Sequence, residues 1–197
     1  RCTMSPTDWE SIAKEMKVDG YKVHSSDLSN IRLLRELKDE QKRIFLATGG
    51  ATEREIEQAL QFVPSSNVVL LHGFQAYPTE LVDSSLSRIQ FLKKKFPEVT
   101  IGYSDHVSGD DQFSKILPLM ALGAGACVLE KHVTLNRAAQ GVDYYSSLEP
   151  SEFHDFVKLA RDAASALPDG LSEAELNYRK TVKKTWVYVD ALQSGHL

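Results

Sequence analysis

Short apolar segments alternate with amphipathic helical patterns along most of the chain, and this alternation constrains the fold more than any other feature. Each expected strand is almost continuously apolar, and a pattern with helical spacing follows it. The expected strands cover residues 20–24, 43–47, 68–72, 100–104 and 126–130. Continuously apolar strands, each followed by a covering helix, are typical of a parallel sheet buried on both faces. The sequence therefore predicts an α/β fold, either doubly wound or closed as a barrel.

The ends of the expected strands favour the barrel, because nearly every strand ends in polar residues that can do chemistry. These ends are residues 22–25, Thr48-Gly49, His72, Ser104-Asp105-His106 and Glu130-Lys131-His132. Barrel enzymes carry their chemistry at the carboxyl ends of the strands. We therefore expect a (β/α)8 TIM barrel with its active site at that end.

The helix signals divide the chain into a large domain and a short C-terminal part. Helices are expected over residues 9–16, 31–37, 86–96, 116–122 and 153–167. Another helix should begin at Thr52, which has capping-box spacing with Glu55. Pro168-Asp-Gly170 ends the last long helix, and a polar stretch and a strand over 185–189 are expected to follow. This predicts a barrel domain over 1–170, then a linker and the beginning of a second module over 171–197.

Composition narrows the class of partner. The chain has 197 residues, of which 42% are hydrophobic and 25% charged, with a formal net charge of -4. Because nucleic-acid and anionic-membrane binders usually carry a basic field, we expect neither partner and favour small-molecule substrates. We find neither a stretch long enough to span a bilayer nor a signal-peptide pattern. With two cysteines, Cys2 and Cys127, a reduced cytoplasmic compartment is expected.

Two histidines are candidate metal ligands. His106 and His132 end consecutive expected strands, and neighbouring strands lie about 4.8 Å apart. Two imidazoles with water and substrate oxygens suit Mn²⁺, Mg²⁺ or Zn²⁺, and Asp143 could add a carboxylate. The alternative is that each histidine only hydrogen-bonds within a loop. His72 is expected near the pocket and His154 at the surface.

Groups for an anionic ligand lie near the same strand ends. Lys22 lies in an apolar strand, where burying its charge without a partner would be costly. Ser25 and Ser104 add hydroxyl donors, and the turn at Thr48-Gly49-Gly50 offers main-chain N–H groups. Together these groups point to a phosphate or carboxylate ligand.

These segments resemble the N-acetylneuraminate (sialic acid) synthase family, which includes the legionaminate, pseudaminate and spore-coat polysaccharide homologues. The resemblance runs from Thr3 to about Leu197. The segments that carry it are Tyr21-Lys-Val-His-Ser-Ser-Asp27, Ala47-Thr-Gly49, Leu70-Leu-His72 with Tyr77-Pro-Thr79, Gly102-Tyr-Ser-Asp-His106, and Glu130-Lys-His132 with Gly141-Val-Asp143 and Ser147-Leu148. The Ser-Asp-His and Glu-Lys-His motifs at this separation are the most specific of them.

The resemblance implies a condensation of phosphoenolpyruvate with an N-acylated aminosugar such as N-acetylmannosamine, which gives a nonulosonic acid and phosphate. It implies that His106 and His132 hold a divalent metal, Mn²⁺ or Mg²⁺, which polarises the sugar aldehyde. The residues implied to bind the substrates are Thr3, Lys22, Ser25, Thr48, Gln75, Tyr77, Ser104 and Asp143. Of these, Thr3, Lys22, Ser25 and Ser104 match the phosphoenolpyruvate site, and Tyr77 and Asp143 match positions that meet the sugar. Asp27, Lys22 and Asp143 are the expected catalytic residues.

The sequence departs from the family at several pocket positions. Asp27 stands where Glu is usual, Ala47 where Ser is usual and Gln75 where Asn is common. The resemblance also places Thr3 at the end of the third barrel strand, so strands three to eight are expected and the first two are not. In the family a C-terminal antifreeze-like domain reaches across a homodimer, and here we expect only its beginning.

Two alternatives to the synthase stay open. One is a metal-dependent aldolase or lyase on a similar barrel, which would bind pyruvate rather than phosphoenolpyruvate; Ala47 and Gln75 motivate it. The other is an inactive fragment or paralogue that folds and only binds metal. The expected loss of two strands motivates this second alternative.

Overall fold

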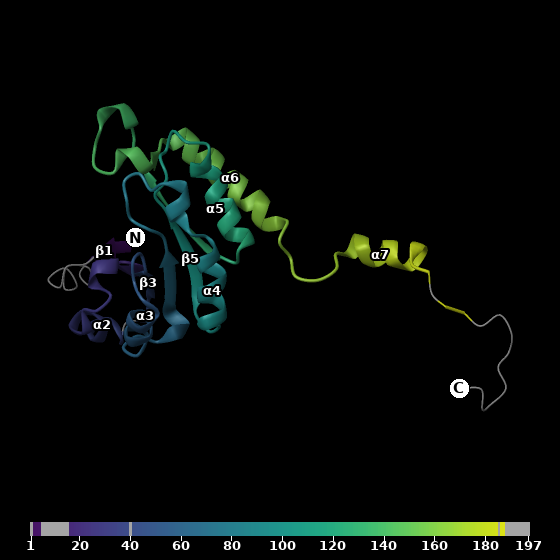
Figure 1. The fold of residues 1–197 in the computed structure, drawn as a ribbon, viewed down its shortest axis with the longest axis horizontal. Coiled ribbons are helices and arrows are strands. Elements are labelled where there is room, and N and C mark those ends of the chain that lie inside the picture. Colours follow the sequence, from purple (N-terminus) through teal and green to yellow (C-terminus); the bar gives the residue numbers. More distant parts are fainter. Residues whose placement is uncertain (1, 5–15, 40, 185, 188–197) are drawn as a thin grey trace.

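The computed structural model describes residues 2–4, 16–39, 41–184 and 186–187, and it confirms the alternation of strands and helices (Figure 1). Among the described residues, seven parallel strands follow one another in chain order across the sheet. The strands are β1 (Cys2–Met4), β2 (Gly20–Val23), β3 (Arg43–Ala47), β4 (Val68–His72), β5 (Thr100–Asp105), β6 (Val128–Val133) and β7 (Ser147–Leu148). Strands β1 to β6 form a curled sheet that is consistent with part of a TIM barrel (Figure 1).

The described helices are α2 (Ile31–Leu37), α3 (Glu53–Leu60), α4 (Ser87–Lys95), α5 (Phe113–Gly123), α6 (Pro150–Ser165) and α7 (Glu173–Val182). Helices α2 to α5 connect the successive strands from β2 to β6, as a parallel sheet requires, and α6 and α7 follow β7. Short 3-10 turns are η1 (Ser25–Asp27), η2 (Ser65–Asn67), η3 (Leu81–Ser84), η4 (Arg137–Ala139) and η5 (Tyr144–Ser146). The capping box predicted at Thr52 is present and begins α3.

The hydrophobic core lies between the sheet and its helices. All five residues of β4 are buried, as expected for a strand covered on both faces. Leu33, Leu34, Ile56, Ile89 and Leu92 extend the core from α2, α3 and α4, and each is fully buried. Burying such side chains stabilises the fold by about 1.5–3 kcal/mol each, so the core holds the strand ends in place.

Strand β6 differs from the sequence prediction. It was expected over 126–130 but covers Val128–Val133, because the chain is still turning at the end of α5. Gly125 has a φ of 103°, and the Ala126 N–H donates to the Ala121 carbonyl. His132 therefore lies inside β6, where it pairs with Ser147 of β7, rather than beyond the end of the strand.

The C-terminal part also differs from the prediction. The polar stretch expected as a linker contains α7, which begins with a capping box between Ser172 and Glu175 and lies apart from the sheet (Figure 1). Of the strand expected over 185–189, only Trp186 and Val187 are described, and neither lies in a strand. The helix expected over 9–16 lies outside the described residues except for Met16.

No helix in the described part of the chain is both long enough and apolar enough to cross a membrane. Cys127 is an exposed free thiol, whereas the side chain of Cys2 lies outside the described residues. The cytoplasmic location stays a prediction.

Candidate functional site

The two predicted ligand histidines lie side by side. Their ring centroids are 5.1 Å apart, and the ring of Tyr77 is edge-on to both, at 5.3 Å and 5.8 Å. His106 is 2% exposed, and neither of its ring nitrogens has a hydrogen-bond partner among the described residues. The burial of His106 and its ring nitrogens without partners argue against the alternative that it only hydrogen-bonds within a loop.

The surroundings of the pair keep both rings neutral. Burial, and secondarily the neighbouring His132, lowers the pKa of His106 to about 4. Burial also lowers the pKa of His132, although Asp143 opposes that shift. Neutral imidazole is the form that binds a metal ion, so at pH 7 the pair offers free ring nitrogens without having to lose a proton first.

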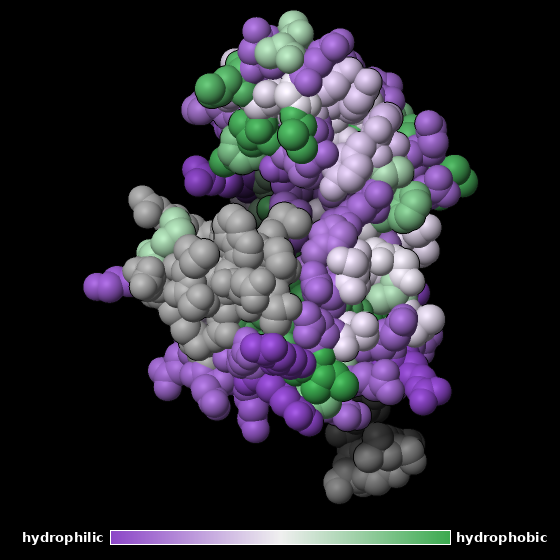
Figure 2. Space-filling view, turned by 90° about the vertical axis from the view of Figure 1, so that its left-hand side faces the viewer, coloured by the Kyte–Doolittle hydropathy of each residue, from purple (hydrophilic) through white to green (hydrophobic). Residues whose placement is uncertain are grey.

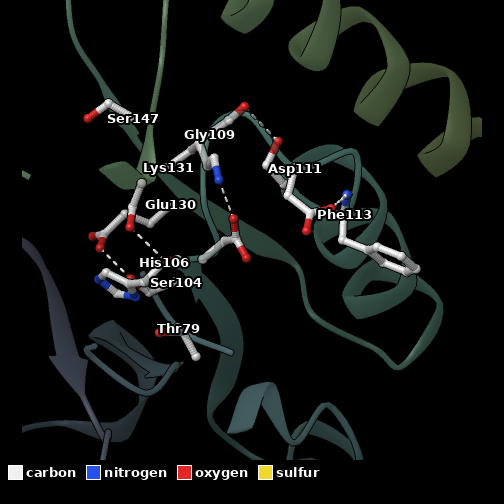
Figure 3. A network of polar contacts seen from close by, with 12 residues as sticks. Thr79, Ser104, His106, Gly109, Asp111, Phe113, Glu130, Lys131 and Ser147 are labelled. Atoms are coloured by element: carbon white, nitrogen blue, oxygen red, sulfur yellow. Dashed lines mark hydrogen bonds and ion pairs between the residues drawn. The ribbon is translucent and has the colours of Figure 1, made fainter. Parts of the chain in front are cut away.

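Lys22 and Ser104 meet at the carboxylate of Glu130, and Figure 3 shows Ser104 beside Glu130. Lys22 Nζ and Ser104 Oγ each lie 2.6 Å from the same Glu130 Oε1. Lys22 is buried, and Glu130 thus supplies the partner that its charge requires. The sequence reasoning assigned Glu130 no role, because only the pairing of β5 with β6 places it opposite Ser104.

The charge of Glu130 is held in place by these two neighbours. Burial by itself would raise the pKa of Glu130, but Lys22 and the hydrogen bonds from Lys22 and Ser104 outweigh burial and lower it. The carboxylate is therefore ionised at neutral pH. An incoming phosphate or carboxylate would compete with it for Lys22 and Ser104.

Other predicted substrate residues lie around this centre with varied contacts. Ser25 Oγ donates to Gln75 Oε1 over a long 3.4 Å, which joins the loops after β2 and β4. The hydroxyl of Thr48 is buried and donates to the Leu71 carbonyl at 3.1 Å. Thr48 thus ties β3 to β4, and its role in binding stays a prediction.

The expected acids and Thr3 have different surroundings. Asp143 has a φ of 57°, and its Oδ2 lies 3.9 Å from His132 Nδ1, so the structure brings it to the histidine pair. Asp27 lies in η1, where it accepts a 3.4 Å hydrogen bond from Asn30. Thr3 pairs with Tyr21 through the main chain, and its side chain lies outside what the structure describes.

Three other described histidines lie outside the pair, and His24 Nδ1 lies 2.9 Å from Ser26 Oγ. His72 Nε2 lies 3.0 Å and 3.1 Å from the carbonyls of Ser84 and Ser85, so the ring anchors the loop after β4. Its Nδ1 is buried without a partner in the described part of the chain, and a place for His72 at the pocket stays a prediction. His154 is exposed on α6, as expected.

The loop between β6 and β7, which carries Asp143, is fixed by an arginine that the sequence reasoning missed. Arg137 forms ion pairs with Glu152 of α6 and Asp110, both at 2.7 Å, and it donates to the Ser147 carbonyl at 2.9 Å. The same loop exposes apolar side chains, among them Val142 at 91%. It forms the upper end of the molecule in Figure 1, where Figure 2 shows apolar residues gathered.

A mainly apolar cavity of about 560 Å³ lies between β6 and α6. Phe45, Leu71, Leu129, Phe153 and Val157 are among its lining residues, whereas neither histidine of the pair lines it. Its wall is largely apolar, although Glu130, Lys131 and Arg161 also line it. We therefore place the candidate site at the histidine pair and the Lys22–Glu130–Ser104 cluster.

Comparisons with known proteins bear on this arrangement. The NeuB family model matches residues 1–172. The N,N'-diacetyllegionaminic acid synthase of Campylobacter jejuni (strain NCTC 11168) is 32% identical over 203 residues, which cover 98% of this chain and 59% of that protein. The pseudaminic acid synthase of Campylobacter jejuni (strain 81-176) is 32% identical over 96% of this chain and 56% of its own length. The chain thus spans about half the length of the curated relatives it matches.

A solved structure agrees with the sequence comparisons. The crystal structure of N-acetylneuraminic acid synthetase from Leptospira borgpetersenii, in complex with citrate, aligns with a TM-score of 0.79 and 34% identity. The alignment covers 91% of this chain and 64% of that one. The curled sheet and its helices therefore have the arrangement of that protein over nearly the whole chain.

Proposed function

The chain belongs to the NeuB family, and from that premise we propose that it forms the catalytic part of a nonulosonic acid synthase. The proposed reaction joins phosphoenolpyruvate to an open-chain N-acylated aminosugar and releases phosphate. Relatives named as legionaminic and pseudaminic acid synthases support this class of product. Because the chain spans about half of their length, we propose the activity for the whole protein.

The observation that carries the proposal is the neutral His106–His132 pair beside a buried lysine. The residues fit a divalent metal, Mn²⁺ or Mg²⁺, because His106 presents two buried ring nitrogens without partners close to a second neutral imidazole. No cluster of three or more His, Cys, Asp or Glu suited to a metal occurs among the described residues. Water and substrate oxygens would complete the coordination. When bound, the ion would supply Lewis-acid polarisation of the sugar aldehyde.

Lys22 and Ser104 are proposed to hold the anionic groups of phosphoenolpyruvate. Both point at one carboxylate oxygen of Glu130, so a ligand anion can take the same donors in the same geometry. A buried ammonium binds an anion more strongly than an exposed one, because less water screens the charge. Ser25 and Gln75 lie at the neighbouring loops and are proposed to complete this subsite.

Asp143 and Tyr77 are proposed to orient the sugar. Asp143 approaches His132, and the Tyr77 ring borders both histidines, so a sugar at the metal would contact both side chains. Asp27 is proposed as the acid or base, on the resemblance of its position. The shorter Asp in place of the family's Glu would then have to act through a water molecule if it does not reach the substrate.

Calorimetry on the full chain tests the substrate class. With Mn²⁺ present we expect phosphoenolpyruvate to bind and pyruvate to bind weakly or not at all, because Lys22 and Ser104 recognise the phosphate. Lys22→Met should abolish binding, whereas Lys95→Met, a matched exposed lysine on α4, should leave it unchanged. Exclusive binding of pyruvate would favour the aldolase or lyase instead, and no binding of either compound would refute the proposed subsite.

Turnover is tested with the whole protein. We expect phosphate release from phosphoenolpyruvate in the presence of Mn²⁺ and an N-acylated hexosamine such as N-acetylmannosamine. No release with any N-acylated aminosugar would refute the synthase assignment.

A further inference from the structure

Strands β5 and β6 present alternate residues of two short motifs to opposite faces of the sheet. Ser104 pairs with Glu130, and Asp105 pairs with Lys131, in the main-chain register of the two strands. Figure 3 shows the Glu130 and Lys131 side chains pointing to opposite sides of β6. The two strands are thus joined by side chains on both faces, immediately before the histidine pair.

The outer of these two links is fully buried. Lys131 Nζ forms an ion pair with Asp105, and their side chains are 1% and 0% exposed. Asp105 also accepts a hydrogen bond from the Tyr103 hydroxyl at 3.1 Å. Each oxygen of the carboxylate is thus engaged, which fixes the side chain in one position.

The orientation of His106 depends on its main chain, because its ring nitrogens have no partners. Its carbonyl accepts the Thr79 N–H at 2.9 Å and the Ser146 hydroxyl at 2.6 Å. Asp105, which Lys131 and Tyr103 hold in place, is the residue immediately before His106. Lys131 carries this anchoring across to β6, one residue before His132.

A bound anion would affect the inner link, between Ser104 and Glu130, but not the outer link, between Asp105 and Lys131. The inner link uses Ser104 and Glu130, and an anion that takes Ser104 and Lys22 would disrupt it. The outer link lies on the other face and shares no side chain with that site. It can therefore hold the strands in register while the inner face exchanges partners.

We infer that the buried Asp105–Lys131 pair is a positioning element that holds the His106 and His132 rings side by side in their tilted arrangement. A metal site tolerates displacements of only about 0.5 Å in its ligands, so a link one residue before each histidine controls the pair more directly than the distant core. The inference rests on the proposed function for its consequence, which is metal affinity. The part of the inference that concerns the relative orientation of the two rings does not depend on the proposed function.

Three variants of the full chain separate positioning from charge burial. Lys131→Met and Asp105→Asn each remove one partner, and the double variant removes the link while leaving no unpaired buried charge. Ile89→Ala, at a fully buried position on α4, is the control for loss of stability elsewhere in the core. All four chains are compared with wild type by thermal unfolding, so that folded variants are identified first.

The first readout needs no metal. In wild type we expect a nuclear Overhauser effect between the ring protons of His106 and His132, measured on histidine-labelled chain. The double variant should remain folded and lose this signal, whereas Ile89→Ala should keep it. The absence of the signal in wild type, or its persistence in the folded double variant, would overturn the inference.

The second readout is the affinity for Mn²⁺, measured by calorimetry. Loss of outer-shell support typically weakens metal binding about 10–100-fold, and we expect at least the lower end of that range for the double variant and no change for Ile89→Ala. If wild type binds no Mn²⁺, the proposed metal site fails, and the ring signal still decides whether the pair positions the histidines. Unchanged affinity in a folded double variant would contradict the positioning role.

Discussion

The inner and outer faces of β5 and β6 are built from the same two short motifs, but the polar side chains on the two faces differ in how completely they find partners. On the inner face His106 has ring nitrogens without partners, and Glu130 occupies donors that a ligand would use. On the outer face Asp105 and Lys131 pair in full burial. Buried polar groups are usually satisfied, so the unpartnered ring nitrogens of His106 agree with the proposed binding role, and the satisfied Asp105–Lys131 pair agrees with a supporting one. Substitutions on the two faces should therefore separate loss of binding from loss of stability.

The largest effect is expected on the outer face. Asp105→Ala would leave the Lys131 ammonium buried without its partner, and breaking a buried pair in this way costs about 3–5 kcal/mol. Urea unfolding measures the change in the free energy of unfolding. On the inner face, His106→Gln should cost much less, because the His106 ring makes no hydrogen bond. Equal losses in the two variants would break the contrast between the faces.

The inner face should respond to pH in the metal-free chain. The pKa of His106 is about 4 when folded, against 6.5 for an ordinary histidine, so the unfolded state binds more protons between these values. The free energy of unfolding therefore falls as pH drops through this window, by roughly 3 kcal/mol from His106. Burial lowers the pKa of His72 and of His132 as well, which adds to the slope.

Urea unfolding at pH 7 and at pH 4.5, with a chelator present, measures this dependence. His106→Gln should show a shallower loss of stability than wild type over the same interval. Identical pH dependence in the two proteins would show that His106 is not buried in its neutral form.

Removing one of the two proposed metal-ligating histidines tests the contrast between the faces through metal affinity. We expect His132→Ala to weaken Mn²⁺ binding more than the about 10–100-fold typical of outer-shell changes, because it deletes one of two protein ligands. His154→Ala, at an exposed histidine of α6, is the matched control and should bind as wild type does. Calorimetry decides, and a similar loss in both variants would point to nonspecific binding of the metal by histidines.

The smallest effect is expected for an ion pair in solvent. Lys95 lies 2.8 Å from Glu57, and the side chains are 41% and 45% exposed. Water screens such a pair, so Lys95→Met should leave the urea midpoint unchanged. A loss of stability comparable to that of Asp105→Ala would mean that burial does not determine how much an ion pair contributes to the stability of this protein.

Much of the fold was predictable because its signals are local. The strands expected over 43–47 and 68–72 coincide with β3 and β4, since each apolar run and its flanking residues are read without knowledge of the rest of the chain. Strand β6 begins two residues later than expected because of the turn at Gly125, which the apolar run conceals. Helix α7 was missed because its signal is a capping box without an apolar face to bury.

The candidate site divides in the same way. The histidine pair was predictable, because two histidines near the ends of consecutive strands must lie close together in a parallel sheet. The side chains that surround the pair could not be predicted in this way. Lys22 meets Glu130 across 108 residues of sequence, and Arg137 fixes the Asp143 loop through contacts to three other segments.

The sequence by itself determined the order of the elements, the end of the sheet that carries the chemistry and the identity of the paired histidines. Those properties depend on the spacing of apolar residues and on the order of the segments along the chain, and both can be read directly from the sequence. Only the tertiary structure decided which face each neighbour of a histidine occupies and which charge it meets. Strand register sets both, and a shift of one residue would exchange the two faces. In the observed register Glu130 faces the ligand groups and Lys131 is buried on the other side with Asp105.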